Sequence, residues 1–222
     1  MSPVKVNHRL LECGKFGAIR KYDVHTGLDL YCEEGANVSS ISDGIVIDVF
    51  QFTGEGVGSP WWNDTHAVVI RTGRLILVYG EINPFVVKGE LVCKGQTLGR
   101  VTSVLRVNKG VTPTSMLHLE VWEEAGYMKN YTWKKGEEKP VGLLNPMTVL
   151  PKWLIKTSHG YILEDYTGAY EKYFTMACDS KAWLMSENIS YTYLKRKADK
   201  AKIDEYKQVT GKTLWWESKE SY

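Results

Sequence analysis

The stretch His25-Thr26-Gly27-Leu28-Asp29-Leu30 carries a histidine and an aspartate, and a later stretch, Leu117-His118-Leu119-Glu120, places a second histidine inside an apolar run. Imidazole nitrogens and carboxylate oxygens are ligands that zinc prefers, and three such ligands leave the fourth coordination position open. Water held in that open position has its pKa lowered to about 7. The two stretches therefore predict a metal site for hydrolysis rather than a purely structural one.

A second interpretation of these residues involves no metal. His25 can be a hydrogen-bonded core histidine and Asp29 a turn former, as such residues often are. That interpretation treats the order of His25, Asp29 and His118 as a coincidence. We therefore expect these three side chains to bind one ion, and zinc is the ion that the ligand set favours.

Length and composition point to a packed globular protein. The chain has 222 residues, 43% of them hydrophobic, enough for one substantial domain and an appendage. Its 28 basic and 26 acidic residues give a net charge of +2, too even for a protein that binds nucleic acid or an anionic membrane surface. Nucleic acid and membrane are therefore not expected partners.

The chain shows no targeting segment. No apolar run approaches the roughly 18 residues that cross a bilayer, and residues 1–9 have no signal-peptide core. We expect a protein without a signal peptide. Cys13, Cys32, Cys93 and Cys178 lack CxxC spacing, so buried thiols are expected, with disulfides left open.

Short β-rich runs punctuated by glycine extend from Gly17 to about Leu150. This spacing predicts a mainly β fold, a compact antiparallel sheet or sandwich. Arg71-Thr72-Gly73-Arg74 separates two Val/Ile/Leu-rich runs and predicts a tight hairpin. The expected strands cover residues 37–40, 44–51, 67–71, 75–79, 97–102 and 116–122.

The sequence changes character after Pro151. Apolar residues recur near helical spacing over 168–188 and again over 191–210. We therefore predict two parts, a β domain over residues 1–150 and a helical accessory or docking segment over 151–222.

A glycine-rich loop over residues 53–64 carries two adjacent tryptophans, Trp61 and Trp62. The tryptophans can wall a cleft and bind substrate. They can equally cover the edge of the core, as large aromatic side chains often do. Both interpretations stay open at this point.

Eight short motifs occur in a fixed order along the chain: Phe16-Gly17, His25 to Leu30, Gly35 to Val38, Asp43 to Val46, Val87 to Gly89, Gly95 to Gly99, His118 to Glu120 and Asn145-Pro146. Together they resemble the lysostaphin/LytM-type zinc endopeptidases. The resemblance spans about residues 13–150 and implies a compact β fold with a zinc-lined groove that cuts peptide cross-links of bacterial peptidoglycan. It also implies that His25, Asp29 and His118 are the zinc ligands.

The chain departs from the family pattern at two positions. The family's last motif is His-x-His, and Met116 stands where its first histidine is expected. A thioether cannot carry a proton in the needed pH range. Tyr79-Gly80-Glu81-Ile82 resembles the family's Tyr-x-His-Leu segment with Glu81 in place of the histidine. Two auxiliary histidines are therefore absent.

Glu81 admits three interpretations. Its carboxylate can act as a general base, with a pKa raised by burial. It can be a fourth metal ligand, which would close the site. It can also be a solvated charge at a strand end. We rank the general base and the solvated charge equally, and closure behind them.

Glu120 and His66 are two further residues considered for roles at the site. Glu120 is expected to orient His118 or to pair with a nearby cation rather than to bind the metal itself. His66 is a conceivable substitute for a missing histidine, although a histidine at a strand start is more often structural. His8 and His159 have no motif around them and receive no role.

Two functions are consistent with this sequence. The first is a zinc endopeptidase acting on peptidoglycan peptides, with Glu81 activating water. The second is a non-catalytic zinc-binding module of the same fold, used in binding, assembly or regulation. The missing signal sequence and residues 151–222 further suggest a bacteriophage virion component that reaches the wall by delivery or lysis; a cytoplasmic protein is the alternative.

Overall fold

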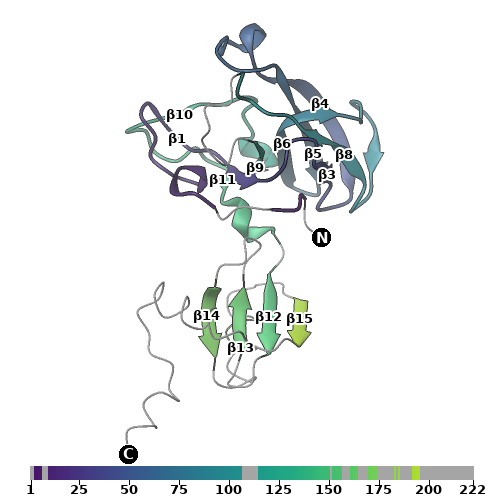
Figure 1. Ribbon diagram of the computed structural model, residues 1–222, viewed down its shortest axis with the longest axis vertical. Helices are drawn as coiled ribbons and strands as arrows, with labels where there is room; N and C mark the ends of the chain where they lie inside the picture. The colour runs from purple at the N-terminus through teal and green to yellow at the C-terminus, as the bar shows by residue number, and fades with distance from the viewer. Residues whose placement is uncertain are drawn as a thin grey trace, which may run out of the picture. The chain divides into compact units, whose positions relative to one another are not determined.

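The computed structural model describes residues 3–6, 10–106, 115–150, 152–156, 161–164, 170–174 and 192–195, together with Trp183 and Met185. The chain divides into two compact units, Met1–Thr148 and Val149–Tyr222. Figure 1 shows their strands.

The first unit is built on a sheet of nine strands in which every pair is antiparallel. Its main path runs in the order β11-β9-β6-β5-β4-β7, while β2 pairs with β9 and β8 pairs with both β6 and β3. The predicted mainly β fold is therefore confirmed. The strands are β2 (Leu28–Tyr31), β3 (Asn37–Ser39), β4 (Gly44–Thr53), β5 (Thr65–Thr72), β6 (Leu75–Pro84), β7 (Leu91–Val92), β8 (Thr97–Val101), β9 (Met116–Glu123) and β11 (Leu143–Leu144).

Smaller elements complete this unit. Strands β1 (Asp23–Val24) and β10 (Trp133–Lys134) form a separate antiparallel pair. The helical elements that the structure describes here are short 3-10 turns, so long helices are absent from this part of the described chain, as the sequence predicts. These turns are η1 (Glu12–Gly14), η2 (Glu55–Val57), η3 (Glu124–Gly126) and η4 (Pro146–Thr148).

The hairpin between β5 and β6 lies where the sequence predicts it. Thr72 pairs with Leu75, so Gly73 and Arg74 form the turn. Gly73 has φ +57°, a left-handed conformation that glycine adopts without steric cost. This turn fixes the register of the two strands.

The central strands are buried on both faces, which explains their continuous Val/Ile/Leu runs. On β5, Ala67, Val68, Val69 and Ile70 are all fully buried, although neighbouring side chains of a strand point to opposite faces. On one face, Trp122 packs with a cluster formed by Ala67, Val69, Ile76, Val78 and Leu143. The core therefore holds β5, β6 and β9 rigidly at the centre of the sheet.

The second unit contains a four-stranded sheet in the order β14-β13-β12-β15. Strands β12 (Trp153–Lys156), β13 (Tyr161–Glu164) and β14 (Tyr170–Phe174) are antiparallel, whereas β15 (Thr192–Lys195) runs parallel to β12. The predicted helices over 168–188 and 191–210 are therefore wrong at β14 and β15. Both segments are rich in aromatic and β-branched residues, which favour strands; the rest of each predicted helix lies mostly outside the described residues.

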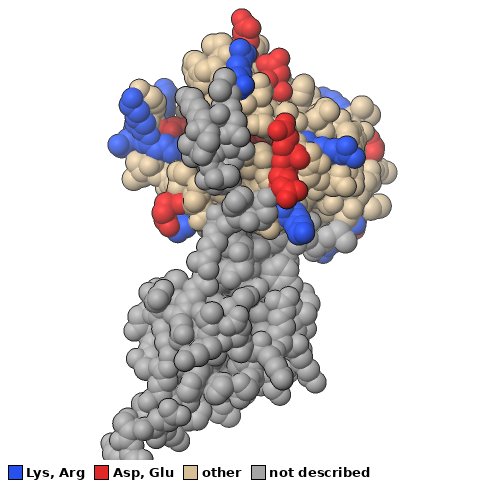
Figure 2. All heavy atoms as spheres, in the orientation of Figure 1, with Lys and Arg blue, Asp and Glu red and all other residues tan. Residues whose placement is uncertain are grey.

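Three cysteines are described, and all are free thiols: Cys32 is buried, as expected, whereas Cys13 and Cys93 are exposed. Cys178, His8 and His159 lie outside the described residues. Among the described helices, none is long and apolar enough to cross a membrane. On the visible face of the first unit, basic and acidic side chains are interspersed (Figure 2), in line with the balanced charge.

The core predicts the outcome of two matched leucine substitutions. Leu77 on β6 is 1% exposed, whereas Leu91 on β7 is 76% exposed. We expect Leu77→Ala to lower the free energy of unfolding by about 2–5 kcal/mol, because it leaves a cavity in a packed interior. Leu91→Ala should change it by less than about 0.5 kcal/mol. Urea titration of both variants measures the difference, and equal losses would contradict this description of the core.

Candidate metal centre

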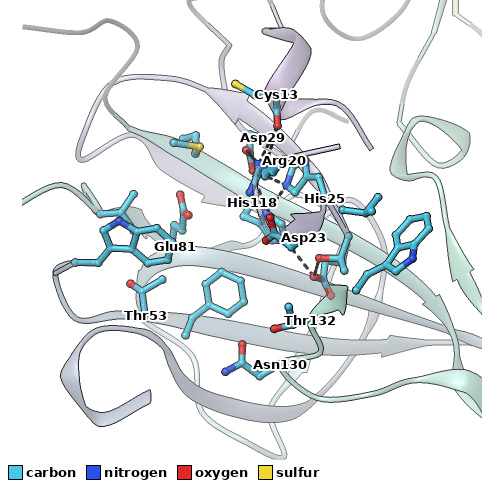
Figure 3. A pocket seen from close by; sticks show the side chains of 18 of the residues that line it. Cys13, Arg20, Asp23, His25, Asp29, Thr53, Glu81, His118, Asn130 and Thr132 are labelled. Atoms are coloured by element: carbon cyan, nitrogen blue, oxygen red, sulfur yellow. Dashed lines mark hydrogen bonds and ion pairs between the residues drawn. The ribbon is translucent and has the colours of Figure 1, made fainter. Parts of the chain in front are cut away.

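The sheet brings the three predicted ligands together. Asp29 on β2 is the register partner of His118 on β9, so their side chains lie on the same face of the sheet. His25 follows β1 and reaches the same point from the turn before β2. All three are buried, and their nearest ligand atoms lie within 4.8 Å of one another. Figure 3 shows the cluster at the wall of a cleft.

The three ligand atoms are spaced as a single ion would require. His25 Nε2 lies 3.2 Å from His118 Nδ1 and 3.1 Å from Asp29 Oδ1. His118 Nδ1 lies 2.9 Å from the same Asp29 oxygen. Ligands at about 2.0–2.1 Å from a tetrahedral zinc ion are about 3.3 Å apart. Small adjustments would therefore suffice to coordinate zinc.

Outer hydrogen bonds orient both imidazole rings. His25 Nδ1 donates to the carbonyl of Lys15 at 2.9 Å, because a carbonyl can only accept. His118 Nε2 lies 3.1 Å from Oε1 of Glu120 and donates to that carboxylate. The remaining nitrogens, His25 Nε2 and His118 Nδ1, are the two that face Asp29. This arrangement of outer partners is typical of metal-binding histidines.

Glu120 is held in place by three donors. Thr26 Oγ1 donates to its Oε1 at 2.6 Å, and Trp122 Nε1 donates to its Oε2 at 2.8 Å. Burial alone would raise the pKa of Glu120, but the hydrogen bond and charge of His118, with those from Thr26 and Trp122, hold the pKa below its usual value. Glu120 thus contacts the ring nitrogen of His118 that points away from Asp29, and is not one of the three converging groups.

The buried carboxylates around His118 are stabilised by a positive charge beside them. Burial would raise the pKa of Asp29, but hydrogen bonds with His118 and His25 hold it well below its usual range. Burial would lower the pKa of His118, but hydrogen bonds with Asp29 and Glu120 outweigh it and raise the pKa to about 10. Without a metal, a proton shared by His118 and Asp29 supplies this positive charge. A divalent cation can replace that proton, since metal ligands must be deprotonated.

Gly27 allows the close approach of β2 to β9. A Cβ atom at this position would lie 2.6 Å from the carbonyl oxygen of Leu119 and 2.7 Å from the ring of His118. Neither distance is sterically permitted. Glycine is therefore required here by the packing against Leu119 and His118.

A cleft of about 480 Å³ adjoins the cluster. Its walls include Glu81, Met116 and Trp62, together with His25, Asp29 and His118. Met116 precedes His118 by two residues on β9, so both side chains face the cleft. The thioether of Met116 thus lies beside the three predicted ligands, at the position where the resemblance leads us to expect a histidine.

Glu81 lies to one side of the cluster (Figure 3) in an unusual environment. It has φ +63°, a strained value for a residue with a side chain. Its Oε2 atom is buried and has no hydrogen-bond partner among the residues that the structure describes. Burial, followed by the charge of Asp29, raises the pKa of Glu81 to about 8. The interpretation as a solvated surface charge is therefore wrong for this carboxyl group.

The two tryptophans have different positions. Trp62 lines the cleft, whereas Trp61 is 63% exposed and is not among the described residues that line it. Their rings meet edge to face with centroids 6.2 Å apart. Trp61 thus does not cover the core. His66 is half-buried on β5 and does not line the cleft, so it does not replace a missing histidine.

Thr26, Trp122 and Arg20 also belong to this centre, although no sequence pattern predicted them. Thr26 and Trp122 hydrogen-bond Glu120, and Arg20 donates to Asp29 Oδ2 at 2.7 Å. Thr26 lies inside the first motif and Trp122 just beyond the second, so proximity in sequence was the only available signal. Nothing in the sequence links Arg20 to Asp29.

Part of the first unit is similar to a known protein family. Residues 23–130 match the model of Peptidase family M23. This match lies within the first unit, and the predicted resemblance to lysostaphin/LytM-type peptidases is confirmed. Among curated protein sequences, none matches this chain.

Similar solved structures include three bacterial proteins. Csd3 of Helicobacter pylori is 25% identical, with a TM-score of 0.39 over 61% of this chain and 36% of that chain. A zinc containing peptidase from Vibrio cholerae is 22% identical, with a TM-score of 0.40 over 63% and 39% of the two chains. The catalytic domain of lysostaphin from Staphylococcus simulans is 17% identical, with a TM-score of 0.40 over 65% and 90%. This chain thus spans less than half of the first two proteins.

Gly27→Ala tests the packing beside His118. We expect it to lower the free energy of unfolding by about 1–3 kcal/mol, because the new methyl group forces backbone or ring to move. It should also shift the side-chain NMR signals of His118. Gly89→Ala, which meets open space at φ +92°, is the control for backbone strain alone. Unchanged His118 signals in folded Gly27→Ala would contradict the account.

The raised pKa of Glu81 predicts a pH-dependent stability in metal-free protein. Because the folded pKa of about 8 exceeds the ordinary value of 4.5, the stabilising contribution is full below pH 4.5 and is lost as the pH rises through 8. Glu81→Gln removes this titration. We expect the variant to gain stability over wild type between pH 5 and pH 9, measured by urea unfolding with a chelator present. Parallel pH profiles for the two proteins would count against the buried carboxyl group.

Proposed function

We propose that this protein is a zinc-binding, peptidoglycan endopeptidase-like hydrolase that cuts peptide cross-links of the bacterial cell wall. One observation carries the proposal: two imidazole nitrogens and one carboxylate oxygen converge, 2.9–3.2 Å apart, at the wall of an open cleft. The match to Peptidase family M23 supports the same reaction class.

The residues present fit a zinc ion. His25, Asp29 and His118 would hold it, and their outer partners already point the correct atoms toward one another. When bound, zinc would polarise the scissile carbonyl and acidify water. The single carboxylate among the ligands leaves net positive charge at the site.

Among the described residues that line the cleft, Glu81 is the one that we assign to proton transfer. Its carboxyl group lines the cleft, and a pKa near neutrality allows it both to take up and to return a proton at Oε2. Its unpartnered oxygen and strained backbone are features often found at functional positions. Met116 can neither accept a proton nor donate a hydrogen bond. Of these two residues, Glu81 alone would therefore transfer the proton.

Trp62 would contact the bound peptide. Its ring lines the cleft and is 39% exposed, so apolar contact with a substrate can still bury part of it. Trp61 would extend the same surface beyond the cleft. The peptidoglycan peptide is thus the expected partner of the first unit.

A second candidate is a catalytically inactive zinc-binding module. Met116 favours it, because the histidine that faces the reacting centre in the active family is replaced by a side chain without acid or base chemistry. Such a module would keep the cleft for binding, assembly or regulation.

We also propose that residues 151–222 attach the protein to a phage particle. The division of the chain into two compact units is compatible with separate tasks for wall cleavage and docking. A protein that never co-sediments with particles from a phage-infected culture would refute this part of the proposal. The alternative is a free protein acting after lysis.

Metal analysis and digestion of purified peptidoglycan test the enzymatic proposal. We expect one zinc ion per wild-type chain and release of new amino termini from the wall. His118→Ala should lose zinc and cleavage together. Glu81→Gln should keep zinc but lose about 10²–10⁴-fold in rate, the usual contribution of a general base.

The outcomes separate the two candidate functions. Equal product formation by wild type and His118→Ala would remove the enzymatic function. Zinc-loaded wild type that binds peptidoglycan without cutting it would establish the inactive module instead.

A further inference from the structure

Arg20 connects residues 13–20, which precede the region that matches the family model, to the three predicted metal ligands. Its Nη2 donates to Asp29 Oδ2 at 2.7 Å, while Nε and Nη2 both donate to the carbonyl of Cys13, at 3.1 and 2.9 Å. Figure 3 shows Arg20 between Cys13 and Asp29. One guanidinium thus connects η1 to a predicted metal ligand.

The two oxygens of Asp29 have separate partners. Oδ2 is taken by Arg20, whereas Oδ1 faces His25 Nε2 and His118 Nδ1. The Nε and Nη2 fork of Arg20 on the Cys13 carbonyl fixes the guanidinium plane, and from that fixed position Nη2 donates to a single oxygen of Asp29. Arg20 therefore leaves only one oxygen of Asp29 directed at the cluster.

A short hairpin fixes the position of Arg20 itself. The backbone N–H of Arg20 donates to the carbonyl of Asp23 at 2.8 Å, and Ile19 forms a β-bridge with Val24. The same segment supplies the Lys15 carbonyl that orients His25. Residues 13–20 thus hold two of the three predicted ligands without binding metal themselves.

We infer that Arg20 is a positioning residue for the metal site, which holds Asp29 as a one-oxygen ligand and connects it to the 13–20 segment. The inference rests on the proposed zinc site but goes beyond it, because Arg20 and its Cys13 partner both precede residue 23, where the family match begins. Arg20 is the sole lysine or arginine among the described residues that line the cleft.

The consequence is a metal affinity that depends on a residue outside the ligand set. Without Arg20, the Asp29 carboxylate would be free to rotate, and both oxygens would compete for the histidines or the ion. Loss of an outer partner of a metal ligand typically lowers metal affinity about 10–100-fold. The effect should appear in binding whether or not the protein cleaves any substrate.

Zinc competition with a chromophoric chelator tests this inference on the full-length protein. We expect Arg20→Gln to raise the zinc dissociation constant by about 10–100-fold and Arg20→Lys to raise it less, because lysine keeps the charge but lacks the fork. Cobalt-substituted Arg20→Gln should also show an altered visible absorption spectrum. Arg100→Gln is the matched control, since Arg100 contacts Asn37 and Phe85 and does not line the cleft.

Thermal unfolding of the metal-free variants separates positioning from general stability. A purely structural role would lower the melting temperature of Arg20→Gln and leave the zinc affinity of its folded form unchanged, which would overturn the inference. If Arg20→Gln does not fold, the same comparison is made with Arg20→Lys. Wild type that binds no zinc would instead refute the proposed function, so the two failures are distinguishable.

Discussion

The pairing of β2 with β9 is the constraint on which the rest of this structure depends. It sets Asp29 opposite His118, and a slip of one residue would move one of them to the other face of the sheet. The register is enforced by the neighbouring apolar pairs, Leu28 with Leu119 and Leu30 with Leu117, all of which are buried. The hydrophobic core thus fixes the relative positions of Asp29 and His118, two of the three predicted metal ligands.

The buried carboxylates of this arrangement favour a positive charge beside them. Two ionised carboxylates, Asp29 and Glu120, are buried around His118, and a third carboxyl group, Glu81, lies nearby with its pKa raised to about 8. Buried carboxylates are stable only when paired or hydrogen-bonded. Arg20 and the two histidines provide that pairing, while the converging atoms of His25, Asp29 and His118 leave room for an ion in place of a proton.

Much of the first unit could be predicted from sequence. The hairpin at Gly73 and the strands follow from turn chemistry and apolar runs, and the two motifs singled out the residues that meet in space. The strands of the second unit could not be predicted in this way. A few apolar residues around Tyr170 and Thr192 recur at helical spacing, and the prediction gave this spacing more weight than their β propensity. In the structure both segments pair with neighbouring strands. Arg20 was missed because its contact with Asp29 arises from the fold of the 13–25 hairpin.

The central claim is that His25, Asp29 and His118 bind one zinc ion. X-ray absorption spectroscopy at the zinc edge of the zinc-loaded protein tests it most directly. We expect only nitrogen and oxygen neighbours at about 2.0–2.1 Å, with outer scattering from two imidazole rings that drops to one in His118→Ala. Sulfur neighbours at about 2.3 Å, or a spectrum unchanged in His118→Ala, would contradict it.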